Sequence, residues 1–231
     1  MRVWLFGIVF AFLLLLSARL DAQQPANSSA PLPVITFTLD FPESNPSHYS
    51  IAVDSAGHAT YECLVKIEDK IEDNPAEQPY NTEFRMSEGN RDRVFDLAKQ
   101  AHYFSGKIDS GKNVAFTGGK ILSYQDGQLS NSARYNYSAL IPVQRLTALF
   151  QNIAGTLEYG RRLAYVHQYQ KLALDEELKR MLEQARNSEI SEIQSVTPAL
   201  REIVDDASVI NMVRARAREL IQIGDTEAAK R

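Results

Sequence analysis

The sequence predicts an α+β fold: an antiparallel sheet built from two hairpins, with one helix across it, followed by a C-terminal α-helical segment. Three observations lead to this expectation. In the front half, apolar residues alternate with polar ones, which is the period of a half-buried strand. The Asp126-Gly127 pair is a strong signal for a tight hairpin turn. Beyond residue 142, the apolar residues recur at the spacing of a helix.

The composition is that of a globular protein and not of a largely disordered chain. Of the 231 residues, 44% are hydrophobic and 23% are charged, which is ordinary for a folded protein. The single cysteine excludes an intrachain disulfide framework and a thiolate zinc cluster. The net charge of −4 excludes an overall basic nucleic-acid-binding protein.

Residues 1–22 are typical of a secretory signal peptide. Arg2 supplies the positive charge, and an apolar stretch of 14 residues runs from Val3 to Leu16. Because a membrane-spanning helix needs about 20 residues, we expect cleavage after Ala22 or nearby and not an uncleaved anchor. Residues 23–33 are expected to be a flexible lead-in. The mature chain is therefore expected to be periplasmic or secreted, with a sheet domain at 34–141 and a helical segment at 142–231 packed on or beside it.

Three stretches of the front half alternate cleanly enough to predict strands. The first spans residues 34–41 and ends at a proline-rich break. The second and third, residues 49–53 and 61–67, flank the turn residues 54–57 and predict a hairpin. The acidic, proline-bounded residues 67–79 are expected to form an exposed loop.

The crossing helix is predicted over residues 88–104. Ser87 is a suitable N-cap, apolar residues follow at helical spacing, and Gly106 is expected to end the helix. The second hairpin is predicted from residues 120–125 and 128–138, which flank the Asp-Gly turn.

The helical segment is predicted to begin with a long helix that has Pro142 in its first turn. Gly155 and Gly160 weaken this helix by about 1 kcal/mol each and allow another element to approach closely. Glu158 and Arg162 have the spacing of an i,i+4 ion pair. The apolar stripe consists of Leu146, Leu149, Phe150, Ile153, Leu157 and Ala164.

Three further helices are predicted after it. One runs from Asp175 to Ala185, a second starts with Thr197 as N-cap before Pro198, and a third carries apolar residues from Val209 to Ile221, with Gly224 near its end. Weak breaks separate these helices. We therefore expect residues 172–223 to be more mobile than the long helix and to supply a partner surface.

Several stretches resemble uncharacterised exported proteins of Gram-negative environmental bacteria. In the helical segment these are Tyr159-Gly160-Arg161-Arg162-Leu163 and the run from Leu172 to Lys179. In the front half they are Tyr49-Ser50-Ile51 and the run from Gly57 to Tyr61. The resemblance implies export but no activity, substrate or catalytic residue.

Residue types that carry chemistry do not assemble into a known motif. The histidines are His48, His58, His102 and His167, and they lack the spacing of helical zinc ligands. We expect the first two in exposed loops and the others on helices, as boundary or surface residues. Cys63 is expected to be an inward packing residue, because Tyr61 and Val65 share its face of the strand.

Three charged or glycine-rich clusters also have simple structural interpretations. Gly118-Gly119-Lys120 lacks the remaining residues of a phosphate-binding loop and predicts a turn or bulge before a strand. The acidic residues of the loop lack the order of a calcium-binding loop, and the arginines lie near a helix end. The acidic residues are Glu68, Asp69, Glu72, Asp73 and Glu77, and the arginines are Arg214, Arg216 and Arg218.

No catalytic, cofactor-binding or metal-ligating residue is expected, and no cofactor. We expect an exported non-catalytic interaction or accessory protein with a protein partner in the cell envelope, and no nucleic acid. One alternative is an extracytoplasmic hydrolase with an unrecognised site. Another is a peripheral membrane-associated protein that uses the basic helix end on anionic lipid.

The signal peptide gives the first prediction. The mature protein should begin at Gln23 or within a few residues of it and should fractionate outside the cytoplasm. N-terminal sequencing of the envelope fraction checks this. Retention of Met1 in that fraction would show anchoring in place of cleavage.

Overall fold

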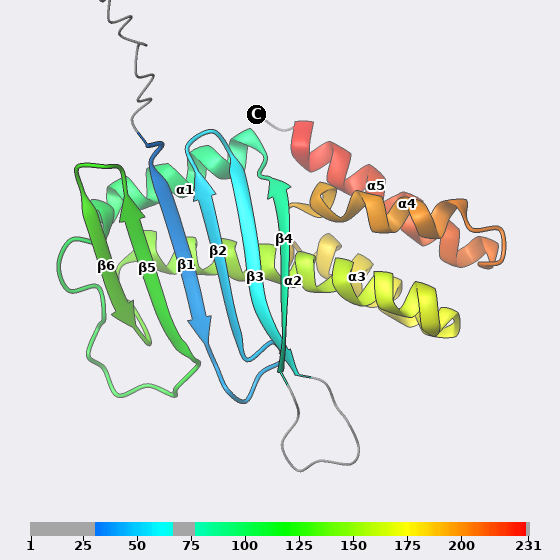
Figure 1. Ribbon diagram of the computed structural model, residues 1–231, viewed down its shortest axis with the longest axis horizontal. Helices are drawn as coiled ribbons and strands as arrows, with labels where there is room; N and C mark the ends of the chain where they lie inside the picture. The colour runs from blue at the N-terminus through cyan, green and yellow to red at the C-terminus, as the bar shows by residue number, and fades with distance from the viewer. Residues whose placement is uncertain (1–30, 67–76, 230–231) are drawn as a thin grey trace, which may run out of the picture. The chain divides into compact units, whose positions relative to one another are not determined.

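The structure is a computed structural model that describes residues 31–66 and 77–229, all within one compact unit. The predicted signal peptide and most of the lead-in lie outside the described residues. Six strands form one antiparallel sheet (Figure 1), in the spatial order β4 (Glu77–Arg85), β3 (His58–Lys66), β2 (His48–Asp54), β1 (Val34–Asp40), β5 (Gly119–Gln125) and β6 (Ser130–Tyr135).

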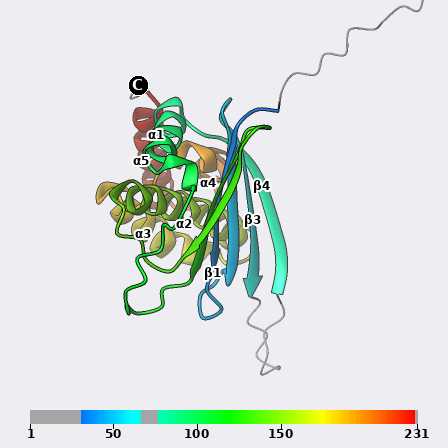
Figure 2. The same cartoon turned by 90° about the vertical axis from the view of Figure 1, so that its left-hand side faces the viewer.

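The described helices all lie on one face of this sheet, and no other described helix or strand covers its opposite face (Figure 2). The predicted α+β class, with antiparallel hairpins and a C-terminal helical segment, is therefore confirmed. The α-helices are α1 (Glu88–Gln100), α2 (Ile141–Tyr169), α3 (Leu174–Arg186), α4 (Thr197–Asp205) and α5 (Asn211–Ala229). Short 3₁₀ helices are η1 (His102–Phe104), η2 (Lys171–Ala173) and η3 (Ile193–Val196).

The first three strands follow the predicted alternation. β1 pairs with both β2 and β5, and β2 and β3 form the predicted hairpin, with Ile51 opposite Tyr61. Because successive residues of a strand face opposite sides, every second side chain turns toward the helices. These buried side chains are Ile35, Phe37, Leu39, Tyr49, Ile51, Val53, Ala59, Tyr61 and Cys63.

The prediction of an exposed loop over residues 67–79 is wrong for residues 77–79, which begin β4. This edge strand pairs with β3 along its length, from Glu77 opposite Lys66 to Arg85 opposite His58. Its signal is weak because an edge strand buries little, and only alternate residues from Tyr80 to Phe84 turn a half-buried side inward. Residues 67–76 lie outside the described part of the chain.

α1 begins where predicted but ends early. The Ser87 hydroxyl accepts a hydrogen bond from the backbone N–H of Asn90, as an N-cap does. The helix ends at Gln100 and not at residue 104, because residues 102–104 all have left-handed φ values of 51° to 61°. This turn buries Phe104 beside the sheet.

The second hairpin closes on Asp126 as predicted. Its carboxylate Oδ1 accepts hydrogen bonds from the backbone N–H groups of Gln128 at 2.9 Å and Leu129 at 2.7 Å, and Gly127 has φ +84°. β6 ends at Tyr135, before the Ser138 end that was predicted.

α2 also crosses the sheet, so two helices and not one cover its inner face (Figure 1). Phe150 stacks on Phe37 of β1, with ring centroids 5.3 Å apart and planes 2° from parallel. The predicted stripe is buried except at Ala164, which is exposed, while Leu163 and Val166 are buried in its place. The stripe therefore keeps its helical spacing but turns toward α3–α5 in its last turns.

The later helices bury their inner sides in the same core. Thr197 does not cap α4, because Val196 holds the cap position. The Thr197 hydroxyl oxygen is buried, and no described residue forms a hydrogen bond with it. This packing argues against the mobility predicted for residues 172–223. The buried side chains are Leu174, Leu178, Met181, Leu182, Ala185, Leu200, Ile203, Val213, Ala217 and Leu220.

Two glycines let η3 pass closely between α2 and α5. A Cβ atom on Gly160 of α2 would lie 2.4 Å from Cγ1 of Val196. Gly224 lies inside α5 and not at its end, and a Cβ there would lie 2.9 Å from the backbone N of Gln194. The close approach predicted for Gly160 is confirmed, and the reason for Gly224 is the same.

A buried carboxylate joins the helical segment to α1. Glu192 accepts hydrogen bonds from the backbone N–H of Ser87 at 2.9 Å, from the Ser87 hydroxyl at 2.6 Å and from Asn90 Nδ2 at 2.6 Å. The N-terminus of a helix carries a partial positive charge, which favours an anion there. Glu192 directly precedes η3, so the start of η3 is fastened to the start of α1.

The two glycines of α2 give a matched pair of variants. Gly160→Ala should destabilise the protein by about 1–3 kcal/mol, because overpacking forces Val196 or the helix to move. Gly155→Ala meets only an ordinary 3.5 Å contact with Ile190 and should be neutral or stabilising by up to about 1 kcal/mol. Chemical denaturation measures both, and equal effects at the two sites would contradict the close packing of η3.

Candidate functional site

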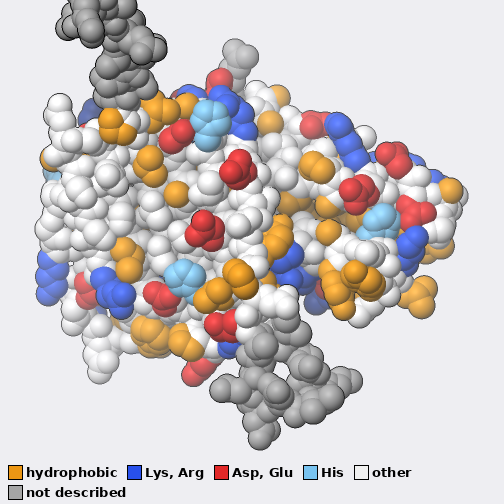
Figure 3. Space-filling model, in the orientation of Figure 1, with side chains coloured by type: hydrophobic (Ala, Val, Ile, Leu, Met, Phe, Trp, Pro, Cys, Tyr) orange, Lys and Arg blue, Asp and Glu red, His pale blue; other side chains and the backbone are white. Residues whose placement is uncertain are grey.

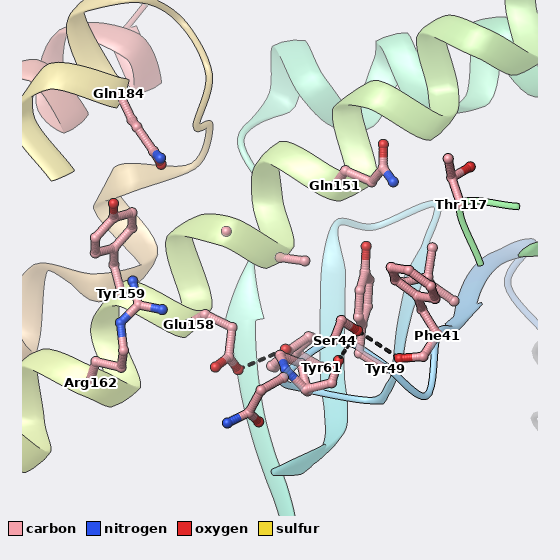
Figure 4. Close-up of a pocket in the computed structure, with 15 residues that line it drawn as sticks. Phe41, Ser44, Tyr49, Tyr61, Thr117, Gln151, Glu158, Tyr159, Arg162 and Gln184 are labelled. Atoms are coloured by element: carbon pink, nitrogen blue, oxygen red, sulfur yellow. Dashed lines mark hydrogen bonds between the residues drawn. The ribbon is translucent and has the colours of Figure 1, made fainter. Parts of the chain in front are cut away.

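An open pocket of about 490 Å³ lies between α2, the end of α3 and the inner face of β1–β3 (Figure 4). We call it the α2 pocket. Its sheet side carries apolar and aromatic side chains, and its helix side carries mainly polar ones. The lining consists of Leu39, Phe41, Ser44, Asn45, Pro46, Tyr49, Tyr61, Thr117, Gln151, Ala154, Gly155, Glu158, Tyr159, Arg162 and Gln184.

A buried carboxylate stands at the bottom of this pocket. Glu158 Oε1 accepts hydrogen bonds from the Tyr61 hydroxyl at 2.8 Å and the Cys63 thiol at 3.6 Å. Its Oε2 accepts two hydrogen bonds from Arg161, from Nε at 3.0 Å and Nη2 at 2.8 Å. The predicted pairing of Glu158 with Arg162 is wrong, because Arg162 bonds Glu177 at 3.3 Å and lies over the Tyr159 ring.

Burial and the Glu158 carboxylate together keep the groups around Glu158 in their protonated forms. It raises the pKa of the Tyr61 hydroxyl far above its usual range, and the nearby Glu158 carboxylate adds to this. Burial also raises the pKa of the Cys63 thiol to about 11. Burial lowers the pKa of the Arg161 guanidinium, but the hydrogen bonds to Glu158 outweigh this effect, so its pKa is raised overall. Neither Tyr61 nor Cys63 is therefore ionised at neutral pH, which makes both poor nucleophiles.

The signal that could have identified Glu158 is its place in the apolar stripe. It lies four residues after Ala154 and eight after Phe150, so a helix brings it to the sheet side. Its partner Tyr61 is 97 residues away in the chain, and only the fold brings the two together.

The histidines are dispersed over the structure. His48 and His58 do not lie in loops but begin β2 and β3, where they contact Asp40 at 2.5 Å and Asp54 at 3.0 Å. His167 lies on α2, and its Nε2 is 2.9 Å from Asp206. His102 lies in η1. Within residues 31–66 and 77–229, no group of three or more His, Cys, Asp or Glu side chains could hold a metal ion.

Gly118-Gly119-Lys120 forms the predicted turn before a strand. Gly118 has φ +93° and β5 begins at Gly119. Lys120 is buried, and its ammonium donates to the carbonyl oxygens of Thr117, Gly118 and Asn136 at 3.1–3.2 Å. Burial lowers the pKa of Lys120. The lysine therefore holds the turn before β5 against the residue that follows β6.

Three residues of the two predicted charged clusters have polar partners within the described part of the protein. Glu77 accepts a hydrogen bond from the Ser47 hydroxyl at 2.5 Å, while the rest of the acidic cluster lies outside the described residues. Among the arginines of α5, Arg216 pairs with Asp175 and Arg214 bonds Asn211. No described helix has both the length and the apolar character of a membrane span.

Hydrophobic side chains gather at the outer end of the helical segment (Figure 3). They come from the end of α2, from η2, from the connection between α4 and α5, and from the first turn of α5. Leu172 is the extreme case, with 99% of its surface exposed. We call this group the helical tip, and it consists of Tyr165, Tyr169, Leu172, Ile210 and Met212, all exposed.

Polar contacts join the segments that carry the helical tip. Lys171 Nζ lies 2.6 Å from Asp206 Oδ2 and 2.7 Å from the Ser208 hydroxyl, and His167 contacts the same carboxylate. The hydrogen bond from Lys171, followed by those from Ser208 and His167, holds the pKa of Asp206 far below its usual range. The connection after α2 and the connection before α5 are thus fixed side by side.

No protein-family model matches the chain, and the comparison with curated proteins found no match. The function is therefore argued from the α2 pocket and the helical tip.

The Glu158 network predicts slow chemistry at Cys63. The thiol is buried and its pKa is raised, so a thiol reagent should modify it slowly in the native protein and quickly after denaturation. Glu158→Ala removes the carboxylate that the thiol contacts and leaves Arg161 unpaired, so labelling should accelerate. Mass spectrometry follows the labelling over time. Fast labelling of the native wild-type protein would contradict the buried position of Cys63 in β3.

Proposed function

We propose that this protein is an exported, non-catalytic interaction protein of the cell envelope, and that a protein partner docks on the helical tip. The observation that carries the proposal is the exposure of five large apolar side chains at one end of the molecule. Exposed apolar clusters rimmed by polar groups are typical of protein interaction sites. Export follows from the signal peptide expected at residues 1–22.

The composition of the helical tip suits a protein partner. Tyrosine, methionine and leucine provide apolar contact area, and aromatic residues and methionine are enriched at protein interfaces. Tyr165 and Tyr169 lie with ring centroids 5.1 Å apart. The pairs of Asp206 with Lys171 and of Asp175 with Arg216 supply a polar rim.

The alternatives have less support. For a hydrolase, Glu158 would be the acid or base of the α2 pocket, but its oxygens already bind Tyr61, Cys63 and Arg161. For a peripheral membrane protein, the basic end of α5 would face anionic lipid, but Arg214 and Arg216 already have partners in the protein.

Capture from an envelope extract tests the proposal. The mature protein is cross-linked in the extract, and the captured proteins are identified by mass spectrometry. The wild type should capture a protein partner. The Leu172→Glu, Ile210→Glu double variant should capture about tenfold less of it, or still less. The matched control is Leu129→Glu, which changes an exposed leucine in the turn between β5 and β6.

Each alternative outcome is decisive. A partner that is retained equally by the Leu172→Glu, Ile210→Glu variant contradicts the helical tip as the docking surface. Co-sedimentation with anionic vesicles at low salt but not at high salt, in the absence of a protein partner, would favour the membrane alternative.

A further inference from the structure

We propose that the α2 pocket binds a short glycan, about two sugar rings long, through the neutral polar side chains that line it. This site is separate from the helical tip and does not depend on a protein partner docking there. The inference rests on which lining groups are still free to bind, on how they are spaced, and on what the pocket walls lack.

Five lining groups have hydrogen-bonding capacity to spare. Four of them form no side-chain hydrogen bond with any described residue: Gln151, Gln184, Tyr49 and Tyr159. The fifth, Arg162, donates one hydrogen bond, from its Nε to Glu177. Figure 4 shows the Tyr49 hydroxyl directed toward the turn of α2 that carries Gln151, and the Tyr159 hydroxyl directed toward Gln184. The free groups therefore form two sets.

The spacing of these two sets fixes the size of the ligand. Gln151 and Tyr159 are eight residues apart on α2, which corresponds to about 12 Å along the helix axis. One sugar ring is too short to contact both sets, whereas a disaccharide can reach them. The pocket volume of about 490 Å³ is also that of a small-ligand site.

The charges of the pocket favour a neutral, hydroxyl-rich ligand. Glu158 is matched by two hydrogen bonds from Arg161, and Arg162 is paired with Glu177. The groups that remain free are mostly phenols and carboxamides, which can both donate and accept hydrogen bonds, as sugar hydroxyls do. Leu39 and Phe41 offer an apolar wall for the C–H face of a sugar ring.

The walls of the pocket do not suit an extended peptide. Such peptides commonly bind by adding a strand to an exposed sheet edge. The pocket is lined from β1, β2 and β3, and each of these strands is paired on both sides. The edge strands β4 and β6 supply none of its lining residues.

Ligand-observed saturation-transfer NMR tests the proposal. The probes are a panel of neutral disaccharides, including cellobiose, maltose and N,N′-diacetylchitobiose, each added to the purified protein. At least one should receive saturation, and titration calorimetry should then show affinity reduced about tenfold in Gln151→Ala and in Gln184→Ala. Tyr159→Phe, which removes only a hydroxyl, should also weaken binding.

The matched control is Gln168→Ala, an exposed glutamine of α2 that does not line the pocket and should bind like the wild type. Circular dichroism verifies that each variant is folded. Failure of the whole panel, or binding that is equal in Gln151→Ala and Gln168→Ala, overturns the proposal, as does tighter binding of an unstructured peptide in the same pocket. These results are independent of partner capture at the helical tip, so the two proposals fail separately.

Discussion

The structure depends on one constraint, which is that α2 must bury side chains on more than one side. Its first half packs on the sheet, where Phe150 stacks on Phe37. Its second half faces the later helices, where Gly160 leaves room for Val196. A helix with apolar groups on several sides cannot stay stable at a surface. The sheet alone covers only one side, so α3–α5 are needed to complete the core.

Two buried carboxylates fix how these layers fit together. Glu158 of α2 reaches Tyr61 of β3, and Glu192 reaches the first residues of α1. Each is satisfied by several hydrogen bonds, since an unpaired buried charge would cost several kcal/mol. Apolar packing alone tolerates small shifts between layers, whereas these hydrogen bonds require one register. The donors around Glu158 are all bound to its carboxylate. The glutamine and tyrosine side chains elsewhere in the α2 pocket therefore remain available to a ligand.

Elements with strong periodicity were predictable from the sequence, and features that depend on distant neighbours were not. The hairpins, the start of α1 and the stripe of α2 follow from local patterns and turn residues. β4 was missed because only Tyr80, Thr82 and Phe84 alternate at a half-buried edge. The partner of Glu158 and the capping role of Glu192 lie about a hundred residues away in the chain. The helical tip, likewise, is assembled only when the connections around Leu172 and Ile210 meet.

The central claim is that the sheet and the helices form one cooperative unit around α2. Native-state hydrogen exchange tests it most directly. The account predicts that amides in the middle of β1 and β2, in α2 and in the inner turns of α5 exchange only through an opening of the same, near-global free energy. Exchange of α3–α5 at a much lower free energy than the sheet, with β1 and β2 still fully protected, would contradict it.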